Sequence, residues 1–148
     1  MDSDSVFEFS YTPSWLTHTP RCTSGFLLVR TSASNIWRLV TVNECQVLVE
    51  KIWLREGQHP NDVPIVTDGR GRRSAASKRG AIAIPRQMRQ SVVVCHEVAH
   101  ELLPYGKKHT EDFVSTFITV LNNNLGISKD ALIETAMDFK VKMNHNLL

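Results

Sequence analysis

The chain contains 148 residues, with 17 Lys and Arg against 15 Asp and Glu, so its formal net charge is only +2. Hydrophobic residues make up 42% and charged residues 22%, which excludes a disordered chain, a collagen-like fibre and a highly charged tail protein. The near-neutral charge argues against nucleic acid binding by the molecule as a whole, but not against a local basic patch. This length predicts one domain with its own core.

We expect neither a membrane segment nor a secretory leader. No apolar run approaches the roughly 18–20 residues of a membrane helix, and the acidic, polar start Met1–Ser5 lacks the features of a signal peptide. The three cysteines are an odd number without a CxxC pair, which argues against a disulfide framework or a cysteine zinc knuckle. We therefore expect a reducing, cytoplasmic environment.

Residues 1–24 are rich in Ser, Thr and Pro with scattered aromatic side chains, and we interpret them as an extended arm before a single domain, 25–148. Within that domain, Phe26–Arg30 and Ile36–Val42 are short apolar runs that favour strands.

Helical spacing follows in Asn43–Glu56, with Asn43 as the expected N-cap and Gly57 as the stop. The expected apolar face of this helix consists of Val47, Leu48, Ile52 and Leu54. The next expected element is a short strand, Asp62–Thr67.

The middle of the chain is predicted to form a loop and then a strand. Asp68–Lys78 is rich in Gly, Arg and Ser, which is typical of a turn or loop. Gly80–Ile84 is expected to be a strand closed by Pro85, and a proline in that place favours an edge strand.

Three helices are expected in the C-terminal half. The first is Gln87–Leu103, with a broad apolar side, and the second is Thr110–Asn122. The third begins after Ser128, which is a suitable cap. Its expected apolar residues are Leu132, Ile133, Ala136, Met137 and Phe139.

The sequence His96-Glu97-Val98-Ala99-His100 lies inside the first of these helices. Residues four apart in a helix lie about 40° apart around its axis, so both imidazoles emerge on one face and can bind the same metal ion. Glu97 lies beside the first ligand and can accept a proton from a water molecule without being a ligand itself. The pattern predicts a Zn2+ site with Glu97 as the catalytic base.

A catalytic zinc ion takes three protein ligands, and His109 is the expected third. Pro104 and Gly106 allow the chain to reverse between the two helices, which would return His109 to the metal. Four carboxylates stay open as alternative third ligands: Glu111, Asp112, Glu134 and Asp138.

The segment 70–79 is strongly basic, with Arg70-Gly71-Arg72-Arg73 followed by Lys78-Arg79. It could contact nucleic acid or an acidic peptide. A solvated loop is the interpretation that we favour, because charge runs usually form one and no aromatic residue is interleaved here for stacking on bases.

Several segments together resemble a family of small HExxH metallohydrolases found in actinobacteria and their phages and, more distantly, SprT-like and other minimal zincin metallopeptidases. They are Ala81–Pro85, Val93–His100, His109–Phe113 and a helix that ends near Leu125-Gly126. The resemblance implies an α+β, zincin-like fold, with a small sheet against the HExxH helix and two further C-terminal helices. It implies His96, His100 and His109 as ligands, Glu97 as general base, and strand 80–84 as an edge that aligns an extended peptide.

We therefore expect a zinc-dependent hydrolase, foremost a metallopeptidase, that acts on a peptide or protein in the cytoplasm, which would be that of a bacterial host if the chain is phage-encoded. Tyr105 is a candidate oxyanion donor. One alternative is a non-catalytic, zinc-stabilised module that binds nucleic acid or protein. Another is a repressor-cleaving phage peptidase with a carboxylate such as Glu111 as the third ligand.

Overall fold

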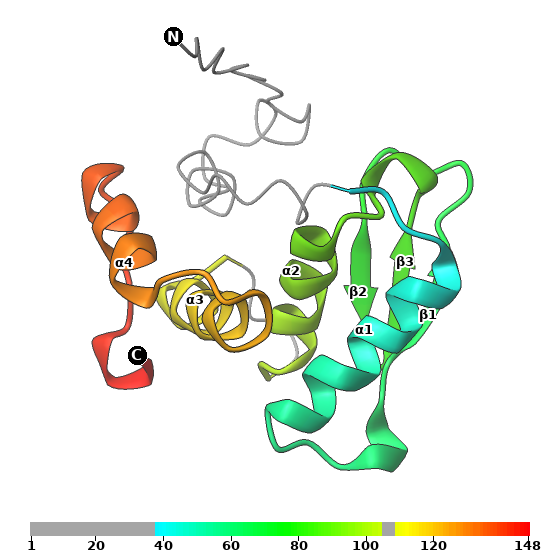
Figure 1. Cartoon of the computed structure of the whole chain (residues 1–148), viewed down its shortest axis with the longest axis horizontal. Coiled ribbons are helices and arrows are strands. Elements are labelled where there is room, and N and C mark those ends of the chain that lie inside the picture. Colours follow the sequence, from blue (N-terminus) through cyan, green and yellow to red (C-terminus); the bar gives the residue numbers. More distant parts are fainter. Residues whose placement is uncertain (1–37, 105–108) are drawn as a thin grey trace, which may run out of the picture.

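The computed structural model describes residues 38–104 and 109–148, which form an α+β arrangement (Figure 1). Its helices and strands, in chain order, are α1 (Val42–Arg55), β1 (Ile65–Asp68), β2 (Ala76–Lys78), β3 (Ala81–Ile84), α2 (Ser91–Glu101), α3 (Glu111–Leu125) and α4 (Lys129–Asp138). The coarse fold class is therefore confirmed.

The N-terminal predictions are only partly covered. The arm 1–24 and the strand Phe26–Arg30 lie outside the described residues, as does the start of Ile36–Val42. In the described part of that last segment, Leu39 makes one isolated bridge to Gln90, and α1 already begins at Val42, so a strand there is wrong. None of the described helices combines the length and apolar character needed to cross a bilayer.

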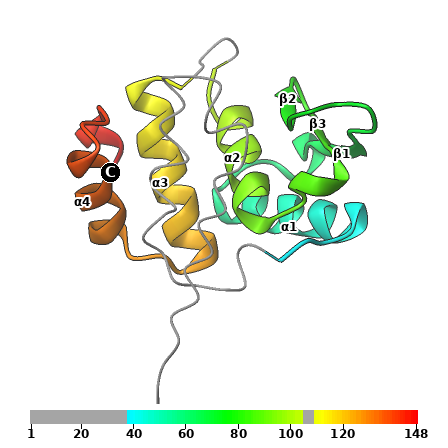
Figure 2. The same ribbon diagram turned by 90° about the horizontal axis from the view of Figure 1, so that it is seen from above.

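The HExxH helix α2 is the central element of the fold. It packs against α3 on one side and against α1 and β2 on the other. Figure 2 shows α4 on the side of α3 that faces away from α2. One side of α2 therefore meets α3 and the other meets α1 and the sheet, whereas α4 is separated from α2 by α3.

The sheet has the order β1-β3-β2, so the strand predicted to be an edge is central. β3 pairs in parallel with β1, with Ile65 opposite Ala81, and antiparallel with β2, with Lys78 opposite Ala81. Pro85 follows the last residue of β3, so its missing N–H removes no hydrogen bond from within the sheet. A proline in this place is therefore compatible with a central strand. The prediction that strand 80–84 is an edge open to a peptide is wrong.

A tight hairpin turn explains why β2 was missed. Only Arg79 and Gly80 separate β2 from β3, and their φ angles are +41° and +82°. Two successive positive φ angles define a type I′ turn, whose twist suits a two-residue hairpin. Part of the segment predicted to be a loop, Asp68–Lys78, is therefore a strand.

The outer edge of β1 is covered by one side chain of α1. The Gln46 side-chain oxygen accepts a hydrogen bond from the Val66 amide at 2.7 Å, and its amide nitrogen donates to the Pro64 carbonyl at 3.1 Å. The side chain thus satisfies the strand as a neighbouring backbone would. The other edge of the sheet is β2, which among the described residues pairs only with β3.

Helix α1 begins earlier than predicted and buries only part of the expected face, namely Ile52 and, partly, Leu48. Thr41, rather than Asn43, is the N-cap, and it forms a capping box with Glu44. Two residues of the expected apolar face, Val47 and Leu54, are 64% and 51% exposed. The buried set is Cys45, Val49, Ile52 and Trp53, which repeats at helical spacing along a neighbouring stripe.

Helix α2 starts four residues later than predicted. The Arg89 carbonyl accepts a hydrogen bond from the Val40 amide at 2.8 Å, and Gln90 has extended dihedral angles. This pairing between two segments of the same chain keeps residues 89 and 90 out of the helix, so the helix begins only at Ser91. A 3-10 turn, Arg86–Met88, occupies the preceding residues.

The last two helices largely confirm the predictions. Thr110 caps α3, which continues to Leu125 and ends at Gly126 in the left-handed region, and Ser128 caps α4. Two residues expected to be apolar contacts of α4 are largely exposed, namely Met137 and Phe139.

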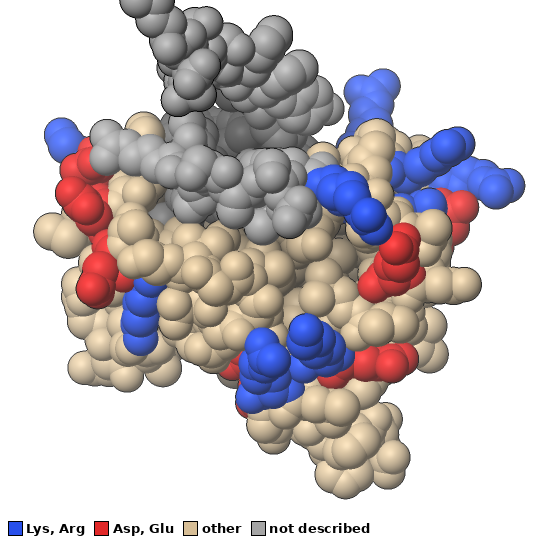
Figure 3. Space-filling view, viewed as in Figure 1, with Lys and Arg blue, Asp and Glu red and all other residues tan. Residues whose placement is uncertain are grey.

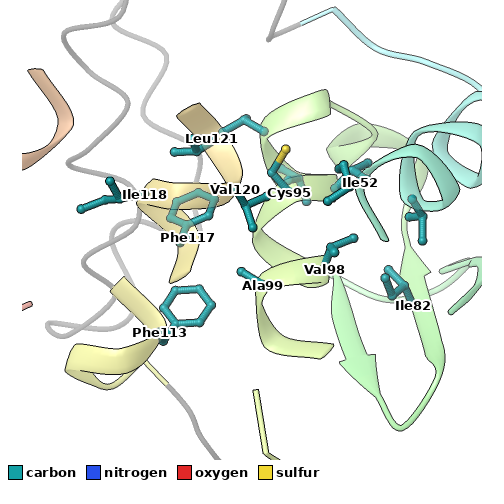
Figure 4. Packing of buried hydrophobic residues seen from close by; sticks show 14 of the residues in the cluster. Ile52, Ile82, Cys95, Val98, Ala99, Phe113, Phe117, Ile118, Val120 and Leu121 are labelled. Carbon is teal, nitrogen blue, oxygen red and sulfur yellow. The ribbon is translucent and has the colours of Figure 1, made fainter. Parts of the chain in front are cut away.

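The core lies on both sides of α2. Figure 4 shows Phe113 and Phe117 of α3 facing Ala99 on one side of the helix, while Val98 points from the other side toward Ile82 of β3. All five side chains are buried. The HExxH helix is therefore fixed between α3 and the sheet by apolar packing.

Candidate metal centre

The three predicted ligands are brought together by two helix ends. His96 and His100 lie one turn apart in the C-terminal half of α2, and His109 stands directly before the N-cap of α3. The Thr110 hydroxyl accepts a hydrogen bond from the Phe113 amide at 3.4 Å, which fixes where α3 begins. The position of His109 relative to α2 thus follows from the capping of α3.

The Nε2 atoms of these histidines form an equilateral triangle. Each of the three Nε2–Nε2 distances, between His96, His100 and His109, is 3.2 Å. A tetrahedral zinc ion with Zn–N bonds of about 2.0–2.1 Å separates two ligand nitrogens by about 3.3–3.4 Å. The triangle therefore has the size that such an ion requires.

The lowered pKa values of two of the three histidines also fit a metal site. Burial, then the neighbouring His100 and His109, hold the pKa of His96 well below its ordinary value. Desolvation also lowers the pKa of His109. Neutral imidazoles present lone pairs, and three lone pairs directed at one point repel each other unless a cation lies between them. These donors match the nitrogen ligands that zinc prefers.

Aromatic packing supports the triad from the side of α3. The ring of Phe113 lies 4.2 Å from that of His100, 5.0 Å from that of His96 and 4.9 Å from that of His109, between centroids. Phe117, one turn further along α3, reaches only His96 among the three, at 5.4 Å. The contact of Phe113 with all three imidazoles was not predicted from the sequence. The position of Phe113 four residues after His109 is the signal that could have indicated it.

Glu97 is buried, with 5% of its surface exposed. Its negative charge raises the pKa of His109, in opposition to desolvation. Glu97 also follows His96 directly in α2, so its backbone is next to that of one of the three histidines. A carboxylate held there, away from bulk water, is suited to accept a proton.

The carboxylates considered as third ligands do not join the group. Within residues 38–104 and 109–148, the potential metal-binding group consists of the three histidines alone. Asp112 accepts a hydrogen bond from the Asn144 side chain at 2.8 Å, and Glu111 is exposed on the first turn of α3. Glu134 and Asp138 belong to α4, which lies beyond α3 (Figure 2). Tyr105 lies outside the described residues.

The residue after the second histidine has a role that the sequence did not reveal. The Glu101 carboxylate accepts a hydrogen bond from the Gly80 amide at 2.6 Å. Gly80 is in the turn between β2 and β3, so this contact ties the hairpin to the end of α2 that carries His100. Cys95 is a buried thiol, and burial raises its pKa.

No protein-family model, curated protein or solved structure matches the chain. Its function must therefore be inferred from the chemistry of the site.

Proposed function

We propose that this protein is a zinc-dependent hydrolase of the HExxH type, with a peptide bond as its target. The observation that carries the proposal is the triangle of Nε2 atoms of His96, His100 and His109, each 3.2 Å from the other two. A second feature supports catalysis rather than a purely structural site: three protein ligands leave a fourth position for water, and an acidic residue, Glu97, is buried nearby.

Zinc held by these histidines would supply Lewis acidity, which lowers the pKa of water toward about 7 and polarises a carbonyl group. The chain itself contributes the proton transfers. The Glu97 carboxylate accepts a proton from the attacking water and then delivers it to the nitrogen of the departing amine. Neutral imidazole ligands leave the positive charge of the ion undiminished, which favours this chemistry.

The free edge of β2 is the place where we expect an extended peptide to bind. β1 is covered by Gln46, and β3 is paired on both sides. β2 packs against α2, and the contact between Glu101 and Gly80 holds its hairpin beside the C-terminal half of that helix. A peptide added to β2 would therefore run alongside the helix that carries the triad.

The metal site can be tested by zinc content and zinc affinity. We expect purified protein to bind one zinc ion, and His96→Ala, His100→Ala and His109→Ala each to weaken binding by at least about tenfold. His145→Ala is the matched control, because His145 is exposed near the C-terminus and is outside the triad. Glu111→Ala should also leave zinc affinity unchanged, and loss of zinc in that variant would show that the third ligand is a carboxylate.

Catalysis is tested separately with Glu97→Gln, which keeps the shape of the side chain and removes the base. We expect this variant to hold zinc as tightly as wild type and to lose at least about 100-fold in the rate of cleavage of a quenched-fluorescence peptide library. If the wild-type protein binds zinc but cleaves nothing in the library, and Glu97→Gln behaves identically, a non-catalytic zinc module would replace the hydrolase proposal.

A further inference from the structure

The charge of this protein is distributed very unevenly along the chain. Residues 69–96 contain seven of the 17 Lys and Arg and none of the 15 Asp and Glu. The remaining residues therefore hold ten basic against fifteen acidic side chains, a formal charge of −5. The small net charge of the chain hides a segment with a formal charge of +7.

The fold brings two parts of this segment into contact. The Gly69 amide donates a hydrogen bond to the Ile84 carbonyl at 3.2 Å, and a Cβ atom on Gly69 would lie only 2.6 Å from the nitrogen of Pro85. The backbone at Gly69 therefore touches the backbone at Pro85. Arg70 and Arg86 are the next residues after these two, so they begin at neighbouring points of the fold. The Gln87 side chain also donates to the Arg72 carbonyl, at 3.4 Å.

Four arginines at this end of the sheet are exposed, and we call them the arginine patch: Arg70, Arg72, Arg73 and Arg86. Figure 3 shows Lys and Arg side chains gathered at the upper right, over the end of the sheet where β1 and β3 finish. The nearby carboxylate of Asp68 is bound at 2.8 Å by Arg89, a fifth arginine whose side chain is only 12% exposed. Arg70 of the patch lies 3.7 Å from the other carboxylate oxygen of Asp68, so this acid is shared between Arg89 and Arg70.

The kind of cation indicates what the surface binds. Residues 69–96 contain six of the ten arginines of the chain but only one of its seven lysines. A guanidinium group presents two parallel donors that match the oxygens of a phosphate, whereas a lysine offers a point charge. No Phe, Tyr or Trp occurs in residues 54–104, so the segment that forms the patch supplies none of these rings for stacking on unpaired bases. These features favour the backbone of a duplex over a single strand.

The surroundings of the patch distinguish nucleic acid from an acidic protein. A protein interface normally has an apolar centre, and none of the large exposed hydrophobic side chains of the described residues lies within 66–104. One such side chain, Leu39, lies beside this segment through its bridge to Gln90, and a single side chain does not make an apolar centre. A nucleic acid interface is polar and positively charged. We propose that the arginine patch binds the phosphate backbone of double-stranded DNA.

This surface is separate from the metal centre. The 3-10 turn that carries Arg86 precedes the N-terminus of α2, whereas His100 lies at the other end of that helix. The nine helical steps from Ser91 to His100 span about 14 Å. DNA binding and zinc binding should therefore be affected by different substitutions.

The test uses the full chain, a fluorescein-labelled 20-base-pair duplex and fluorescence anisotropy over a series of salt concentrations. Four phosphate contacts predict a slope of about −3 to −4 in a plot of log affinity against log salt. The triple variant Arg72→Gln, Arg73→Gln, Arg86→Gln should weaken binding in 50 mM salt by at least about tenfold and reduce the slope by about 2–3.

The matched control removes the same charge elsewhere, by Lys51→Gln, Lys140→Gln and Lys142→Gln, all at exposed positions. It should bind DNA much more tightly than the patch variant. Glu97→Gln should bind DNA as wild type does, so a failure of the hydrolase proposal leaves this one standing. The proposal is overturned if wild type does not bind the duplex in 50 mM salt, if both triple variants lose affinity equally, or if a poly-glutamate peptide binds at least as tightly as the duplex.

Discussion

Phe113 stacks on His100 with the two ring planes inclined by 24° and their centroids 4.2 Å apart. The same ring touches the other two imidazoles edge-on, so one buried side chain of α3 contacts the whole triad. The arrangement of the histidines is therefore held by packing between α2 and α3. A site prepared in this way loses little side-chain freedom when a metal binds.

Replacing Phe113 by Leu should weaken zinc binding by about tenfold, because three imidazoles lose the ring that orients them. Phe117→Leu is a matched control, since Phe117 is equally buried but touches only His96 among the triad. Both variants should lose similar stability in denaturant unfolding of the metal-free protein. Zinc affinities measured by chelator competition should differ between them, and equal affinities would contradict a special role for Phe113.

The stability of the metal-free protein should fall below about pH 6.5. The folded-state pKa values of His96 and His109 are lowered, so the unfolded chain binds protons first as the pH falls. Their contribution is complete above the unfolded pKa of about 6.5 and is lost as the pH drops toward the lower folded values. Urea unfolding with a chelator present, between pH 8 and 5, measures this loss. His96→Gln should flatten the pH dependence, and an unchanged curve would count against a buried neutral His96.

Replacing Gln46 by Ala should destabilise the protein by about 1–3 kcal/mol, because the Val66 amide and the Pro64 carbonyl each lose a partner at the edge of the sheet. Gln58→Ala is a suitable control, since the Gln58 side chain bonds only weakly to the nearby Glu56 carbonyl, at 3.4 Å. Guanidinium unfolding of the two variants compares them directly. If Gln46→Ala matches the control, the side chain does not protect the edge.

A proline at Ser77 should reduce peptide cleavage without unfolding the sheet. Hydrogen-bonded and non-hydrogen-bonded pairs alternate along a hairpin, so we expect the pair next to the one that flanks the turn, Ser77 opposite Ile82, to direct the Ser77 amide toward the open edge. Removing one such donor should lower kcat/KM by about 3- to 10-fold. Ser77→Ala keeps the amide and should retain full activity. A Ser77→Pro variant with wild-type kcat/KM would place the peptide elsewhere.

The C-terminal helices and the shared helix face of two of the three histidines could be anticipated because they depend on local patterns. The spacing of His96 and His100 follows from helix geometry, and Ser128 and Gly126 mark helix ends by their own chemistry. The choice between His109 and Asp112 could not be made from spacing. It depends on a tertiary contact, the hydrogen bond from Asn144 that occupies the aspartate.

The order of the strands could not be predicted from the sequence for a similar reason. β3 is central because it pairs in parallel with β1, which is separated from it by residues 69–80. A short apolar run predicts a strand but does not indicate which strands pair with it. The hairpin was overlooked because Arg79 is an unusual residue for a positive φ angle. The buried face of α1 was misplaced because Val47 and Leu54 are apolar yet exposed.

The Gln46 side chain, which bonds to the outer edge of β1, also influences where this sheet can gain a further strand. Because Gln46 occupies the outward Val66 amide of β1, the addition of a further strand is favoured at β2. If two copies of the chain paired through their β2 strands, the combined sheet would have six strands. Its two outer strands would both be β1, each with Gln46 bonded to its outward Val66 amide. Such an arrangement favours a pair over a fibre.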